Sequence, residues 1–103
     1  MSKKPSKFSI QAKSKHWPGL AKLSEEMGEL QQVIGKLMQV DGNAEYFDGT
    51  DLEDKFIEEF GDVYACMNYM VQKCSFVEQR IDLINARCEE KTAKYCKWRE
   101  EDK

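Results

Sequence analysis

The chain has 103 residues and a mass of 12.0 kDa, which suits one domain with a modest hydrophobic core. Hydrophobic residues make up 41% and charged residues 34%, a balance typical of a globular protein rather than a disordered one. The net charge is −3, but residues 1–15 hold five lysines and no acid, so the remainder holds 11 basic and 19 acidic residues. This acidic surplus argues against nucleic-acid binding by the folded part.

Residues 1–15 are therefore expected to form a basic N-terminal arm, and residues 16–103 to form the domain. No apolar run is long enough to span a membrane, and the lysine-bearing start lacks the apolar segment of a signal peptide. The four cysteines form no C-x-x-C pair and fall within helical patterns, as reduced thiols would. We expect a cytoplasmic protein without membrane association.

The first helix is predicted over residues 18–39, after a break formed by residues 16–19. Its apolar residues recur at steps of three and four, the pattern of an amphipathic helix, at Leu20, Leu23, Met27, Leu30, Ile34 and Leu37. Glu26 falls at the margin of this apolar face, and Glu29 lies one turn further along on the same side. Burying a carboxylate beside apolar neighbours is costly unless a cation or donor meets it.

Two further helices are predicted after a loop rich in turn residues at 41–49. A capping box at Thr50 and Glu53 opens the second helix, and a similar box at Ser75 and Glu78 opens the third. The inner face of the third helix is expected to contain Val77, Ile81, Ile84, Cys88 and Tyr95. Three long helices with short connections predict an all-α antiparallel bundle.

The second helix repeats the acid pattern of the first. Glu59 falls inside its apolar arc, and Asp62 lies three residues on, at the flank. In an antiparallel pair these two acids and the pair Glu26 and Glu29 can converge on one patch. Four carboxylates without Cys or His ligands suit a hard cation, Mg²⁺ or Mn²⁺. The alternative is that these acids form a solvated helix flank.

On the third helix Arg80, Arg87, Lys91, Lys94 and Trp98 form one stripe beside the apolar face. Such a stripe would hold a phosphate tail, because arginine offers forked donors and lysine a point charge. Salt bridges to acids of the first two helices are an equally good interpretation.

The residues 25–30, EEMGEL, followed by residues 59–62, EFGD, resemble the EExxE…ExxD pattern of the MazG-like all-α nucleoside triphosphate pyrophosphohydrolases. The resemblance covers about residues 16–98 and implies a bundle of the NTP pyrophosphatase type, completed by oligomerisation as a dimer or tetramer. It also implies that Glu26, Glu29, Glu59 and Asp62 hold Mg²⁺, and that Glu25 assists the ligands or orients water. Residues 16–17 look like the aromatic approach segment of the related dCTP pyrophosphatases.

The sequence departs from the family in two places. The 29 residues between Glu29 and Glu59 imply a longer loop than relatives have. Thr92 stands where relatives often carry Asn in an Asn-x-Lys-Phe sequence, which leaves the nucleotide preference open.

The expected reaction is Mg²⁺-dependent hydrolysis of an NTP or dNTP to the monophosphate and pyrophosphate. Glu25 or Glu29 would act as general base toward the attacking water. The residues expected to bind the substrate are His16, Trp17, Arg87, Lys91, Lys94 and Trp98. Two alternatives remain: an enzyme like phosphoribosyl-ATP pyrophosphohydrolase, and a non-catalytic helical module for partner binding or oligomer assembly.

Overall fold

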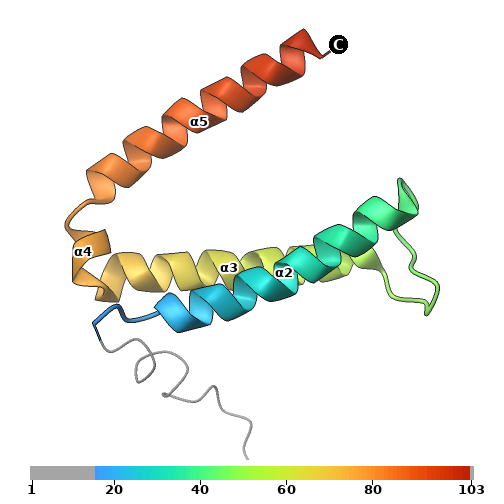
Figure 1. Ribbon diagram of the computed structural model, residues 1–103, viewed down its shortest axis with the longest axis horizontal. Helices are drawn as coiled ribbons and strands as arrows, with labels where there is room; N and C mark the ends of the chain where they lie inside the picture. The colour runs from blue at the N-terminus through green and yellow to red at the C-terminus, as the bar shows by residue number, and fades with distance from the viewer. Residues whose placement is uncertain (1–15, 103) are drawn as a thin grey trace, which may run out of the picture.

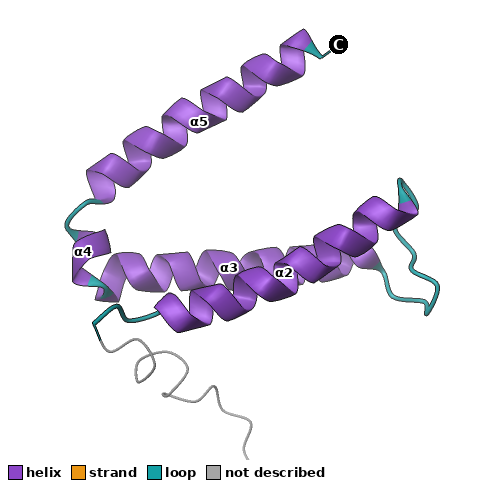
Figure 2. Ribbon diagram, in the orientation of Figure 1, coloured by secondary structure: helices purple, strands orange, loops and turns teal. Residues whose placement is uncertain are grey.

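The computed structural model describes residues 16–102, so the basic arm expected at residues 1–15 lies outside the described part. Its helices are α2 (Leu20–Val40), α3 (Leu52–Lys73), α4 (Ser75–Glu78) and α5 (Ile81–Glu101) (Figure 1). Helix accounts for 78% of the described residues, and none of them forms a strand (Figure 2). The predicted all-α class is therefore confirmed. No helix in this range has both the length and the apolar composition needed to cross a membrane.

Helices α2 and α3 pack side by side in antiparallel directions and are joined by the loop 41–51 (Figure 1). The cap predicted at Thr50 is wrong by one residue. Asp51 is the N-cap of α3, and its Oδ1 accepts a hydrogen bond from the backbone N–H of Asp54 at 3.1 Å. A carboxylate suits this place because it also meets the positive end of the helix dipole. Thr50 instead donates its own N–H to Asp48 in the loop.

The buried seam of this hairpin is rotated away from the apolar face that the sequence predicts for α2. The buried residues are Glu26 and Val33 on α2, and Leu52, Glu59, Val63 and Met70 on α3. Met27, which belongs to the predicted face, is 52% exposed. The seam thus uses only one edge of the apolar stripe, which is how two glutamates come to lie inside it.

The prediction for the third helix is wrong in three respects: its continuity, its N-terminal cap and its packing. The chain breaks at residues 79–80, because Arg80 leaves the helical region with φ −119° and ψ 25°, so the segment divides into α4 and α5. Ser75 makes no side-chain cap, and Cys74 occupies the N-cap position. Helix α5 then projects from the hairpin instead of packing along it (Figure 1). Ile84 and Tyr95, expected inside a bundle, are consequently exposed.

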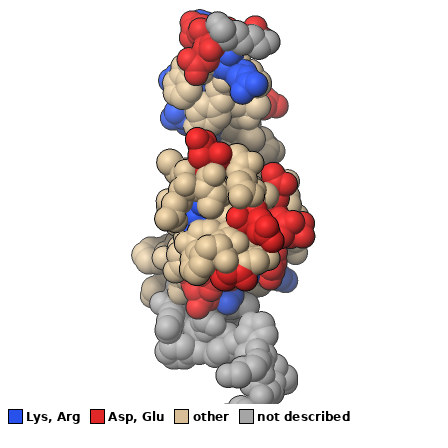
Figure 3. Space-filling view, turned by 90° about the vertical axis from the view of Figure 1, so that its right-hand side faces the viewer, with Lys and Arg blue, Asp and Glu red and all other residues tan. Residues whose placement is uncertain are grey.

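The hairpin is strongly acidic. Residues 16–74 hold twelve acidic and four basic residues, not counting His16. Seen from the end that carries the 41–51 loop, carboxylates are much more prominent than basic groups over the hairpin (Figure 3). Such a surface repels polyanions unless a cation lies between them.

Candidate metal centre

Two nine-residue segments on α2 and α3 repeat one pattern at a spacing of 33 residues. Residues 22–30 read KLSEEMGEL and residues 55–63 read KFIEEFGDV, so four positions are identical and four more keep their chemical character. Because the two helices are antiparallel, this repeat relates them by an approximate two-fold axis (Figure 1). Residues 33 apart in sequence therefore occupy equivalent places around Glu26 and Glu59.

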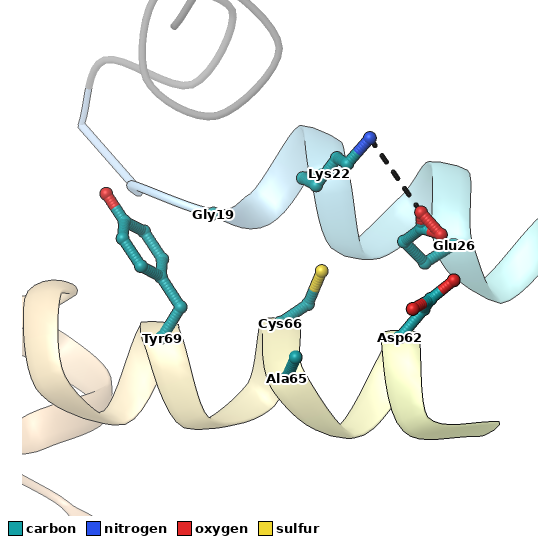
Figure 4. Close-up of a pocket in the computed structure, with 7 residues that line it drawn as sticks. All are labelled: Gly19, Lys22, Glu26, Asp62, Ala65, Cys66 and Tyr69. Atoms are coloured by element: carbon teal, nitrogen blue, oxygen red, sulfur yellow. Dashed lines mark ion pairs between the residues drawn. The ribbon is translucent and has the colours of Figure 1, made fainter. Parts of the chain in front are cut away.

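Three of the four predicted ligands come together. Glu26, Glu29 and Glu59 each place one carboxylate oxygen within 4.8 Å of the others. Glu26 and Glu59 are only 7% and 5% exposed, whereas Glu29 is exposed. Asp62, the equivalent of Glu29 in the repeat, lies outside this group, and its side chain is one methylene shorter. Its carboxyl group lies beside that of Glu26 (Figure 4).

Each buried glutamate has one oxygen near a lysine and one oxygen without a partner. Lys22 Nζ lies 3.8 Å from Glu26 Oε2, and Lys55 Nζ lies 3.1 Å from Glu59 Oε2. The two Oε1 atoms are buried and have no hydrogen-bond partner in residues 16–102. A buried carboxylate oxygen in this state is costly, so the pair marks a place for a cation or a donor.

The electrostatic interactions in the cluster also favour a bound cation. Burial raises the pKa of Glu26, and the neighbouring carboxylate of Glu29 raises it further. Lys22 acts in the opposite sense, while Asp62 and Glu59 add to the rise. A bound dication would instead lower the pKa of every carboxyl group in the cluster, because nearby positive charge favours the ionised form.

Lys22 and Lys55 also belong to this centre, although the apolar periodicity of the two helices does not indicate them. Each lies four residues before a buried glutamate, a spacing that brings side chains together on a helix. The repeat of residues 22–30 at 55–63 indicates both lysines, but it is overlooked when each acid pair is considered separately. Lys22 also lies 2.6 Å from Glu25, so this predicted general base is held in an exposed ion pair.

A cavity of about 310 Å³ opens beside Glu26 on the acidic flank of the hairpin (Figure 4). It is lined by residues of both helices and of the turn before α2: Gly19, Lys22, Glu26, Asp62, Ala65, Cys66 and Tyr69. The carboxyl groups of Glu26 and Asp62 lie at one end, and the Tyr69 ring lies at the other (Figure 4). Burial raises the pKa of the Cys66 thiol, so it forms a neutral wall.

The predicted substrate-binding residues do not line this cavity. The rings of His16 and Trp17 contact each other edge to face, with centroids 6.4 Å apart. On α5, Lys91 Nζ lies over the ring of Tyr95, and Lys94 Nζ lies 5.7 Å from the ring centroid of Trp98.

The remaining predicted substrate-binding residue, Arg87, pairs with Glu90 on the same helix. Because α5 does not pack along the hairpin, a single chain does not bring the stripe to the acids.

The residues present fit a hard divalent cation. The group offers only carboxylate oxygens, two of them buried and unpartnered, and includes no Cys or His. Compared with protein-family models, curated proteins and solved structures, the chain matches none of them.

Proposed function

We propose that the protein is a Mg²⁺-dependent nucleoside triphosphate pyrophosphohydrolase, which converts an NTP or dNTP to the monophosphate and pyrophosphate. The observation that carries this proposal is the group of three carboxylates with two buried oxygens that lack partners. The acidic hairpin would repel a triphosphate on its own, so a substrate of this kind needs a cation between the two. The resemblance of both acid motifs to the MazG-like enzymes supports the same choice.

Glu26, Glu29 and Glu59 would hold the Mg²⁺ ion, or Mn²⁺ in its place, with Asp62 added from the side of the cavity. Bound there, the ion would neutralise phosphate oxygens and lower the pKa of a water molecule.

In this reaction the water oxygen forms a bond to the α-phosphorus, and the bond from that phosphorus to the bridging oxygen breaks to release pyrophosphate. Glu29 is the better placed general base of the two predicted, because it belongs to the cluster and is exposed to solvent. Glu25 is engaged by Lys22 at 2.6 Å, so it would position that lysine. Glu29 would take one proton from the water.

The proposal includes a homo-oligomer, either a dimer or a tetramer. The flank of the hairpin opposite the acids carries an apolar groove of about 350 Å³, and Met27, Phe60, Tyr64 and Met67 along it are about half exposed. Contiguous exposed apolar surface of this kind marks an interaction site. An assembly would also allow the basic stripe of α5 to reach the acids of another chain. We place this assembly in the cytoplasm, where its four free cysteines would stay reduced.

The exposed faces of α5 also favour the second candidate, a non-catalytic helical module for assembly. A module of this kind would form oligomers without any response to Mg²⁺.

A panel of nucleoside triphosphates, deoxynucleoside triphosphates and phosphoribosyl-ATP, scored for pyrophosphate release with Mg²⁺ and with EDTA, tests the proposal. We expect release that requires the metal and falls at least 100-fold in Glu26→Gln. Glu58→Gln is the matched control, because Glu58 is exposed and lies outside the cluster. Absence of pyrophosphate release from every substrate would leave the assembly module as the better explanation.

A further inference from the structure

The repeat makes the two ends of the acid cluster comparable, residue by residue. The pairs related by 33 positions share a place in the hairpin but differ in chemistry. On one side stand Gly19, Cys66 and Tyr69, and their equivalents are Leu52, Val33 and Lys36. An approximate two-fold centre thus has two unlike ends.

At the Gly19 end the hairpin is hollow. Gly19 has φ 94°, and a Cβ built there would lie 2.7 Å from Met70 Cγ and 3.0 Å from Tyr69 Cδ2. The absence of a side chain lets the turn approach α3 while the 310 Å³ cavity beside it stays open. At the other end the equivalent of Gly19 is Leu52, which is only 1% exposed. Its packed side chain occupies the space that is open beside Gly19.

The two ends also suit different parts of a nucleotide. Tyr69, Cys66 and Ala65 give the cavity an aromatic and mostly apolar wall, and its volume lies in the range of small-molecule sites. The equivalent of Tyr69 is Lys36, which is exposed on the same flank of α2 as Glu29. Lys55 borders Glu59 at that end as Lys22 borders Glu26 at the cavity.

We infer that the cavity at the Gly19 end binds the heterocyclic base of the substrate, and that the triphosphate crosses the acid cluster so that pyrophosphate leaves at the Lys55 end. This inference rests on the proposed function and adds to it the direction in which the substrate lies. The hairpin can hold the base at one end only, because Leu52 and Val33 pack at the equivalent place. Specificity for the base is then set by side chains at the α3 wall of the cavity, chiefly Ala65 and Cys66.

The test uses a pair of substitutions at equivalent exposed positions, Ala65→Leu and Gln32→Leu. Both place the same side chain on a helix surface, but only Ala65 lines the cavity. In the presence of Mg²⁺ we expect Ala65→Leu to weaken binding of the ribo- and deoxynucleoside monophosphates at least tenfold in calorimetric titrations, while binding of inorganic pyrophosphate is unchanged. Gln32→Leu should leave the binding of the monophosphates and of pyrophosphate as in the wild type. Equal effects of the two substitutions would overturn the inference.

A second measurement uses the wild-type protein and needs no turnover. The four cysteines fall in separate tryptic peptides, so the rate of alkylation by iodoacetamide can be followed at each. With Mg²⁺ present, nucleoside monophosphates should slow alkylation of Cys66 at least fivefold, and pyrophosphate should not. The exposed Cys88 and Cys96 are internal controls whose rates should stay constant.

The two proposals fail in different ways. A protein that releases pyrophosphate from nucleotides but leaves Cys66 equally reactive with and without monophosphate retains the proposed function and loses the base site. A protein that protects Cys66 but hydrolyses nothing retains the base site and loses the proposed function.

Discussion

Replacing Glu59 by Gln separates a metal ligand from an ordinary buried residue. Glu59 is almost fully buried, and its carboxylate lies within 4.8 Å of those of Glu26 and Glu29. With an effective dielectric constant of about 20, each like-charged pair at that distance costs about 3.5 kcal/mol, so the two cost about 7 kcal/mol at most, and less because solvent screens the exposed Glu29. The attraction to Lys55 at 3.1 Å recovers about 5 kcal/mol at most, and less because Lys55 is partly exposed.

The metal-free Glu59→Gln protein should therefore be more stable than the wild type by about 2 kcal/mol, which raises the melting temperature by about 8 °C for a chain of this size. With Mg²⁺ the order should reverse. A ligand at about 100 times its Kd stabilises the native state by about 2.7 kcal/mol, and the variant lacks one of the ligand groups.

Thermal denaturation followed by circular dichroism, at one fixed protein concentration with EDTA or with Mg²⁺, measures both effects. Glu58→Gln is the control, because it removes the same charge from the neighbouring residue, which also pairs with Lys55 at 3.6 Å but is exposed. The control should respond to Mg²⁺ as the wild type does. A Glu59→Gln protein that is destabilised in EDTA and keeps the full Mg²⁺ response would refute the reasoning.

Three further outcomes are expected. In urea denaturation, Gly19→Ala should destabilise the fold by about 1–3 kcal/mol, because φ is positive at Gly19 and the added Cβ collides with α3. The control Gly28→Ala should stabilise it by about 1 kcal/mol, because a Cβ on this helical glycine meets no neighbour. Since the pKa of Glu26 is raised in the folded state, the free energy of unfolding of the metal-free protein should fall as pH increases from about 4.5 through the raised pKa. In a pH series of denaturation curves, Glu26→Gln should remove this pH dependence. Sedimentation at micromolar concentration should give a dimer or tetramer, and Tyr64→Glu should shift it toward the monomer; a strict 12 kDa monomer in the wild type would contradict the proposed assembly.

The sequence by itself determined the helical class and the two central acids. Periodicity of the apolar residues placed α2 and α3 to within a few residues, because a 3.6-residue repeat over more than 20 residues has no other good explanation. The same projection placed Glu59 in the apolar arc, and its burial is confirmed. The repeat at 22–30 and 55–63 was also present in the sequence and would have indicated Lys22 and Lys55.

Only the tertiary structure decided which edge of the apolar stripe is buried and where the third helix goes. An amphipathic stripe as wide as that of α2 allows several rotations about the helix axis, and the choice depends on how the side chains of α3 fill the space. The break at Arg80 depends on backbone geometry that no periodicity predicts, so the sequence pattern does not reveal that α5 projects from the hairpin. The cavity at Gly19 likewise arises from the approach of a turn to α3, which involves residues 50 positions apart. Contacts of this range are fixed by packing, and the spacing of residues along one helix carries no information about them.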